Sequence, residues 1–100
     1  MSGEKLNSQE RIIAEIFAMC DSHTAGMTNK ELAEKVETTA TNVCRDLAIF
    51  EKFGLADRDT KGRWRLSPKF GGLAGQIAKS YQKARLLLSE EEAKYMSAMQ

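Results

Sequence analysis

Apolar residues recur at helical spacing in the first segment of the chain. They stand at i, i+1, i+4, i+5 and i+8, and they are Ile12, Ile13, Ile16, Phe17 and Cys20. This spacing predicts one apolar stripe on a helix over residues 8–21. Asn7, three residues before Glu10, provides a capping-box-like start for that helix.

Two shorter helical patterns follow. Thr28 and Glu31 form a capping-box pair, and the apolar residues after them predict a helix over residues 29–36. After a turn at residues 37–38, a third helix is expected from residue 39 or 40 to residue 53. Its apolar face consists of Val43, Leu47 and Phe50. Gly54 and Leu55 predict a Schellman-type end to this helix.

The hydrophobic period then changes from helical to alternating. Residues 55–58 and 63–66 are two short runs around a glycine-containing connection, which predicts a β-hairpin. In the second run Trp64 and Leu66 alternate with Arg63 and Arg65, so Trp64 is expected to be a core residue rather than a platform for a nucleotide.

The last thirty residues are rich in helix formers. Gly71 and Gly72 indicate a hinge or turn before them. A capping-box pattern from Ser89 to Glu92 favours a break into two helices over one long helix. A stripe at spacings of three and four residues predicts a dimer seam, with packing against the first helix as the alternative. Its members are Phe70, Ala74, Ile77, Tyr81, Ala84 and Leu88.

The order of elements defines the expected fold. Helix, short helix, turn, helix and hairpin together are typical of a winged helix-turn-helix. The chain is therefore predicted to be mainly α with a small β-hairpin. Residues 1–69 are expected to form a DNA-binding winged helix-turn-helix domain, and residues 70–100 a C-terminal helix or helices that dimerise.

Four segments in this order resemble the DNA-binding domain of the isocitrate lyase regulator (IclR-type) family. The segments are Gly26–Glu34, Thr41–Leu47, Phe50–Ala56 and Gly62–Pro68, and the resemblance covers residues 7–70. It implies a sequence-specific regulator of transcription that binds double-stranded DNA, with a recognition helix at about 39–53 and a wing at 55–66. Family members usually carry a large effector-binding domain, and no small-molecule sensor is evident here.

Charge is distributed unevenly along a chain whose net charge is only +1. Residues 1–57 hold six basic and ten acidic side chains, whereas residues 58–85 hold eight basic side chains and one acidic one. The expected wing and the segment after it are therefore the electropositive part of the chain. A solvated surface with no ligand is the alternative explanation of such a run.

Two groups of side chains are candidates for DNA contact. At the start of the third helix these are Thr39, Thr41, Asn42 and Arg45, although Thr38 or Thr39 is also needed as the N-cap. Arg45 could instead pair with a glutamate of the neighbouring helix. On the hairpin the candidates for phosphate contact are Lys61, Arg63 and Arg65, with an Arg63 pair to Asp57 or Asp59 as the alternative.

Other functions have little support in the residues. Cys20, Cys44 and the single histidine, His23, are too few for a structural zinc site, and both thiols are expected to be buried. No catalytic motif or phosphate loop is present, so neither enzyme activity nor a cofactor is expected. With no membrane span or signal peptide, a cytoplasmic location is expected. A protein-interaction module with the same fold, and a non-specific nucleic-acid binder, remain the alternatives.

Overall fold

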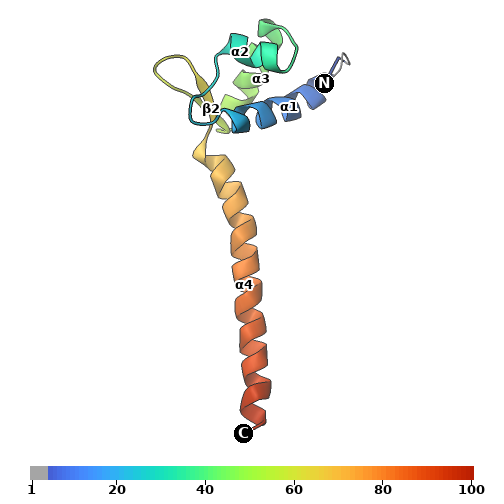
Figure 1. Ribbon diagram of the computed structural model, residues 1–100, viewed down its shortest axis with the longest axis vertical. Coiled ribbons are helices and arrows are strands. Elements are labelled where there is room, and N and C mark those ends of the chain that lie inside the picture. Colours follow the sequence, from blue (N-terminus) through green and yellow to red (C-terminus); the bar gives the residue numbers. More distant parts are fainter. Residues whose placement is uncertain (1–4) are drawn as a thin grey trace. The chain divides into compact units, whose positions relative to one another are not determined.

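The computed structural model describes residues 5–100, and the chain divides into two units, Met1–Lys69 and Phe70–Gln100. The elements are α1 (Ser8–Asp21), α2 (Asn29–Lys35), α3 (Ala40–Lys52), β1 (Ala56–Arg58), β2 (Trp64–Leu66) and α4 (Pro68–Ala98) (Figure 1). The prediction of a mainly helical chain with one small antiparallel hairpin is confirmed. Among the described residues, no helix is both long enough and apolar enough to cross a membrane.

Local capping sets the ends of the helices in the first unit. Asn7 and Thr28 each accept from the backbone N–H three residues on, and Glu10 and Glu31 complete the two capping boxes. At the end of α3, Gly54 has φ of 70°, and Leu55 N–H donates to Phe50 C=O at 2.7 Å. This is the expected Schellman motif, which reverses the chain toward β1.

The turn between α2 and α3 uses the same motif without a glycine. Glu37 has φ of 57°, and Thr38 N–H donates to Ala33 C=O at 2.9 Å. A non-glycine residue in this left-handed region costs roughly 1 kcal/mol or more. The motif nevertheless ends α2 sharply, and α3 begins at Ala40, three residues after Glu37.

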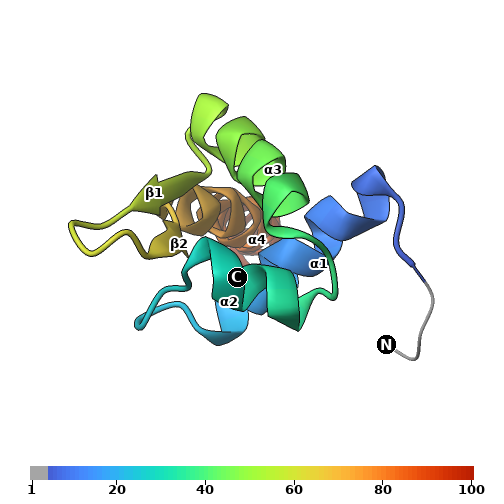
Figure 2. The same cartoon turned by 90° about the horizontal axis from the view of Figure 1, so that it is seen from above.

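The core of the first unit lies among the three helices and the hairpin, whose β1–β2 loop projects away from the helices (Figure 2). Met19, Leu32, Val43 and Leu47 are at most 1% exposed. Ala56 pairs with Leu66 and Arg58 with Trp64 across the hairpin. Met27 and Trp64 exchange backbone hydrogen bonds of 3.0 and 2.7 Å, so the loop before α2 extends the sheet.

Two expectations about packing are wrong. The buried face of α1 is formed by Glu15, Ala18 and Met19, whereas Ile13 and Phe17 are more than half exposed. The face is rotated because α1 packs on β2 and α2 through the side that carries Met19. Cys20 and Cys44 are both exposed free thiols rather than buried ones.

Most of the second unit belongs to one continuous helix, α4. The predicted break at Ser89 and the predicted hinge at Gly71–Gly72 are therefore absent. Neither glycine has a positive φ, and each costs a helix only about 1 kcal/mol relative to alanine. Ser89 and Glu92 simply continue the helix. No residue of α4 is buried.

Candidate nucleic-acid interface

Helix α3 is anchored along one side and free along the other. Val43, Leu47 and Phe50 are at most 2% exposed and fix the helix in the core. Thr41 and Arg45 lie one turn apart on the exposed side, followed by Ala48 and Lys52 at the same helical spacing. The exposed stripe of α3 is therefore polar at its N-terminal end and presents one cation, Arg45, near its middle.

Two of the predicted contact residues at the start of α3 also have local roles. Thr39 is the N-cap, and its hydroxyl accepts from Asn42 N–H at 3.1 Å. The side-chain amide of Asn42 donates to Thr38 Oγ1 at 3.0 Å, and Asn42 is half-buried. Thr39 and Asn42 therefore stabilise the first turn, whereas Thr41 and Arg45 point into open surface.

Asn29 connects the three elements that surround this surface. Its Oδ1 accepts from Trp64 Nε1 at 2.9 Å, and its Nδ2 donates to Cys44 Sγ at 2.9 Å. Trp64 is 5% exposed, which confirms its assignment to the core. One side chain at the start of α2 thus holds β2 and the exposed side of α3 in fixed relation.

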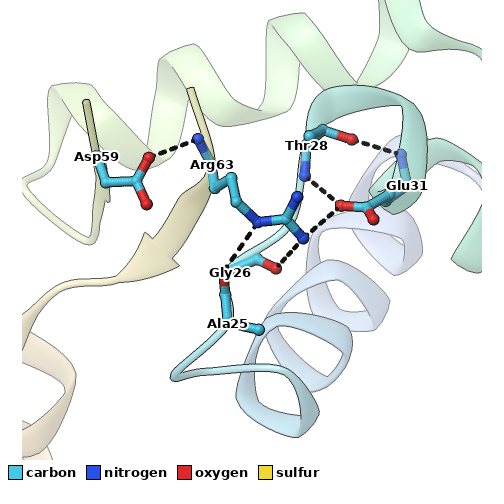
Figure 3. A network of polar contacts seen from close by, with 6 residues as sticks. All are labelled: Ala25, Gly26, Thr28, Glu31, Asp59 and Arg63. Carbon is cyan, nitrogen blue, oxygen red and sulfur yellow. Dashed lines mark hydrogen bonds and ion pairs between the residues drawn. The ribbon is translucent and has the colours of Figure 1, made fainter. Parts of the chain in front are cut away.

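The hairpin loop is organised by Asp59. Its Oδ1 accepts from Arg63 N–H at 2.9 Å (Figure 3). The same oxygen accepts from Lys61 N–H at 2.8 Å, and Gly62 allows the turn with φ of 77°. The N–H of Arg63, followed by that of Lys61, lowers the pKa of the Asp59 carboxyl. These bonds order the loop and leave the ammonium group of Lys61 exposed at its tip.

Arg63 is placed differently from the other hairpin cations. Its guanidinium donates to the carbonyl oxygens of Ala25 and Gly26, at 2.9 Å each, and to Glu31 Oε1 at 2.8 Å (Figure 3). It pairs with neither Asp57 nor Asp59 through its side chain. The same Glu31 carboxylate accepts Thr28 N–H, which is the main cause of its lowered pKa. Arg63 therefore ties the hairpin to the start of α2.

Gly26 makes this close approach possible. It has φ of 74°, and a Cβ added there would lie 3.1 Å from Arg63 Cβ and 3.2 Å from Trp64 O. Both the positive φ and the close neighbours therefore favour glycine at this position.

The other predicted DNA-contacting cations, Arg45, Lys61 and Arg65, take part in none of the three ion pairs found among residues 5–100. Those pairs are Arg11–Asp46, Lys35–Asp21 and Arg63–Glu31. Arg45, Lys61 and Arg65 are exposed. The pairing of Arg45 with a glutamate on the neighbouring helix, considered from the sequence, is therefore not found. Arg58 was not among the predicted contact residues. Its guanidinium carbon lies over the Trp64 ring, 5.4 Å from the ring centroid.

A buried polar cluster that the sequence reading missed braces α3 from behind. Arg11 of α1 donates from Nε and Nη2 to the two carboxylate oxygens of Asp46, the Nη2 contact being 3.0 Å. Glu15 is fully buried and accepts no hydrogen bond. Burial, reinforced by the neighbouring Asp46 carboxylate, raises the pKa of Glu15 to about 9. Glu15 is therefore protonated at neutral pH.

The predicted dimer residues all lie on α4. Phe70 is half-buried, and Ile77, Tyr81, Ala84 and Leu88 are exposed. Comparison with known proteins adds nothing to these observations, because neither a family model nor a curated protein matches the chain.

Proposed function

We propose that the first unit is a winged helix-turn-helix that binds double-stranded DNA sequence-specifically and regulates transcription. The observation that carries the proposal is the exposed side of α3. It presents Thr41 and Arg45 on a helix that is fixed from behind by the core and by the Arg11–Asp46 pair. A rigidly mounted, exposed helix of this width fits the major groove of B-DNA.

The exposed polar groups divide into two roles. Arg45 can donate two hydrogen bonds to a guanine, and Thr41 can contact a base edge or a phosphate. Lys61 and Arg65 on the hairpin are suited to phosphates, which position the protein without reading sequence. Arg63 is assigned a different role from the one that the sequence suggested. It holds the hairpin in place, and the proposal gives it no phosphate.

Dimerisation through α4 is part of the same proposal. Two copies related by a two-fold axis would read an inverted repeat, because operator symmetry mirrors protein symmetry. Half-sites bound together gain affinity from the high effective concentration of the second unit.

A protein-interaction module is the second candidate, and two observations favour it. The first unit has eleven basic and eleven acidic side chains, so it lacks the positive net charge usual in DNA-binding domains. In addition, Ile49 and Phe53 toward the end of α3 are 50% and 58% exposed. An apolar surface of this kind is more typical of a protein partner than of DNA.

The experiment is selection of duplexes from a randomised library by the full-length protein, followed by salt-titrated binding of a selected and a scrambled duplex. The DNA-binding proposal predicts an enriched motif and log K falling with log salt at a slope of about −2 or steeper, since Lys61 and Arg65 each contribute roughly one unit. Equal binding of both duplexes would identify a non-specific binder. Failure to bind any duplex would favour the protein-interaction module.

A further inference from the structure

Helix α4 exposes an apolar seam along one face, which Glu91 interrupts between Leu88 and Tyr95. The seam consists of Ala74, Ile77, Tyr81, Ala84, Leu88 and Tyr95, spaced mainly three and four residues apart. Ile77, Tyr81, Leu88 and Tyr95 are each 63–70% exposed. An isolated helix gains little stability from propensity alone in water, so this seam needs a partner surface.

Two further charged residues, Arg85 and Glu92, lie beside the seam, one before and one after Leu88. Arg85 lies three residues before Leu88, and Glu92 lies four residues after it. They are seven residues apart, which places them on the same edge of the seam, in equivalent heptad positions. A shallow groove at this point is lined by Arg85, Leu88, Ser89, Glu91, Glu92 and Tyr95.

We propose that the partner is a second copy of this chain, and that the two α4 helices pair antiparallel with Leu88 at the centre. Reversal of the second helix brings Arg85 of each copy beside Glu92 of the other, so two reciprocal ion pairs flank Leu88. The same register sets Tyr81 against the partner's Tyr95. Charge pairing at such flanking positions sets the orientation of paired helices.

A parallel pair does not satisfy the same residues. The edge that carries Arg85 and Glu92 then meets the opposite edge of the second helix. There Arg85 faces Ser80 of the partner copy, and Glu92 faces its Leu87. Both charges are left without an opposite charge, and Glu92 lies against an apolar side chain. The charge pattern therefore selects the antiparallel arrangement. The pairing needs only α4, so a failure of DNA binding would leave it standing.

The first experiment is sedimentation of the full-length protein with charge reversals. Arg85→Glu and Glu92→Arg should each weaken the dimer about tenfold, because each turns both flanking pairs into like-charge contacts. The double reversal should restore the dimer to within about threefold. Lys83→Glu, a matched reversal on the opposite side of the helix, should change the dimer dissociation constant by less than about threefold. A monomer at about 100 µM, or a double reversal no better than the single ones, would overturn the proposal.

The second experiment tests orientation by disulfide cross-linking in a Cys20→Ser/Cys44→Ser background. Leu88→Cys should cross-link to itself, because the two positions meet at the centre. Tyr81→Cys should not, since its two copies would lie about 21 Å apart along the helices, far beyond disulfide reach. A mixture of Tyr81→Cys and Tyr95→Cys should cross-link. Self-linking of Tyr81→Cys as fast as that of Leu88→Cys would show a parallel pair and refute the inference.

Discussion

Removal of the Arg63 side chain should destabilise the fold of the first unit rather than only its binding to DNA. Arg63→Ala deletes three hydrogen bonds, to Ala25 O, Gly26 O and Glu31 Oε1. These bonds join the residue that precedes β2 to α2 and to the segment before it, across more than thirty residues of sequence. Their loss weakens the attachment of the hairpin to α2, which the Trp64–Asn29 and Trp64–Met27 hydrogen bonds still hold.

The size of the effect follows from the exposure of each partner. The ion pair with Glu31 is part-exposed, with side-chain exposures of 30% and 48%, and contributes at most about 1 kcal/mol. The carbonyl of the buried Gly26 loses a donor, and with Ala25 this costs roughly 1 kcal/mol more. A total of about 2 kcal/mol should lower the Tm of a unit of this size by roughly 10 °C.

Trp64, the single tryptophan, begins β2 directly after Arg63, and its fluorescence provides the probe of unfolding. Thermal unfolding of the full-length protein, followed by Trp64 fluorescence, should show the lowered Tm for Arg63→Ala. Lys61→Ala, which removes an exposed ammonium from the same loop, should leave the Tm within about 2 °C. An unchanged Tm for Arg63→Ala, together with a DNA-binding salt slope reduced by about one unit, would refute this reasoning.

Three further predictions concern stability. Because the pKa of Glu15 is about 9 when folded and about 4.5 when unfolded, the folded state holds one extra proton between these values. The stabilisation of the fold by this proton is fully present below about pH 4.5 and falls by up to ~1.4 kcal/mol per pH unit as the pH rises toward 9. In urea unfolding across this pH range, Glu15→Gln should lack this slope. Parallel stability–pH profiles for the two proteins would contradict the prediction. Asp46→Ala, which strands Arg11, should cost about 3–5 kcal/mol in urea unfolding, and a loss below 1 kcal/mol would argue against a buried ion pair. Glu37→Gly should raise stability by about 1 kcal/mol by relieving its positive φ, and a lowered Tm would count against that backbone assignment.

Elements of the first unit were predictable because their signals are local. Each capping box lies within four residues, and the Schellman end of α3 depends on Gly54 and its immediate neighbours. The hairpin was indicated by alternation around Gly62. These features depend on residues that are close together in the sequence, so the sequence alone was enough to locate them.

The role of Arg63 depends on contacts between distant segments, which local patterns do not encode. Its partner Glu31 lies 32 residues away, and the capping-box pattern gave no sign of this pairing. A signal for Asp46 was available, because it falls between Val43 and Leu47 on the apolar stripe of α3. A charge within such a stripe indicates a buried partner, and that partner, Arg11, is 35 residues away.

The segment after the hairpin shows the limit of local start signals. Ser89 and Glu92 match a capping box. Such a box marks the start of a helix only where the residues before it are not helical. Residues 73–88 hold strong helix formers, so the helix continues through both. The glycines at 71 and 72 lower helix stability without ending it.

The claim that α3 reads DNA sequence is tested most directly by Arg45→Ala. Its affinity for the selected and the scrambled duplex should be measured across a salt series, beside Lys61→Ala. The account predicts that Arg45→Ala loses about 1–3 kcal/mol on the selected duplex and much less on the scrambled one, whereas Lys61→Ala weakens both alike and reduces the salt slope by about one unit. If Arg45→Ala keeps the full preference for the selected duplex while Lys61→Ala abolishes it, the hairpin reads the bases, and the assignment of α3 as the recognition element is wrong.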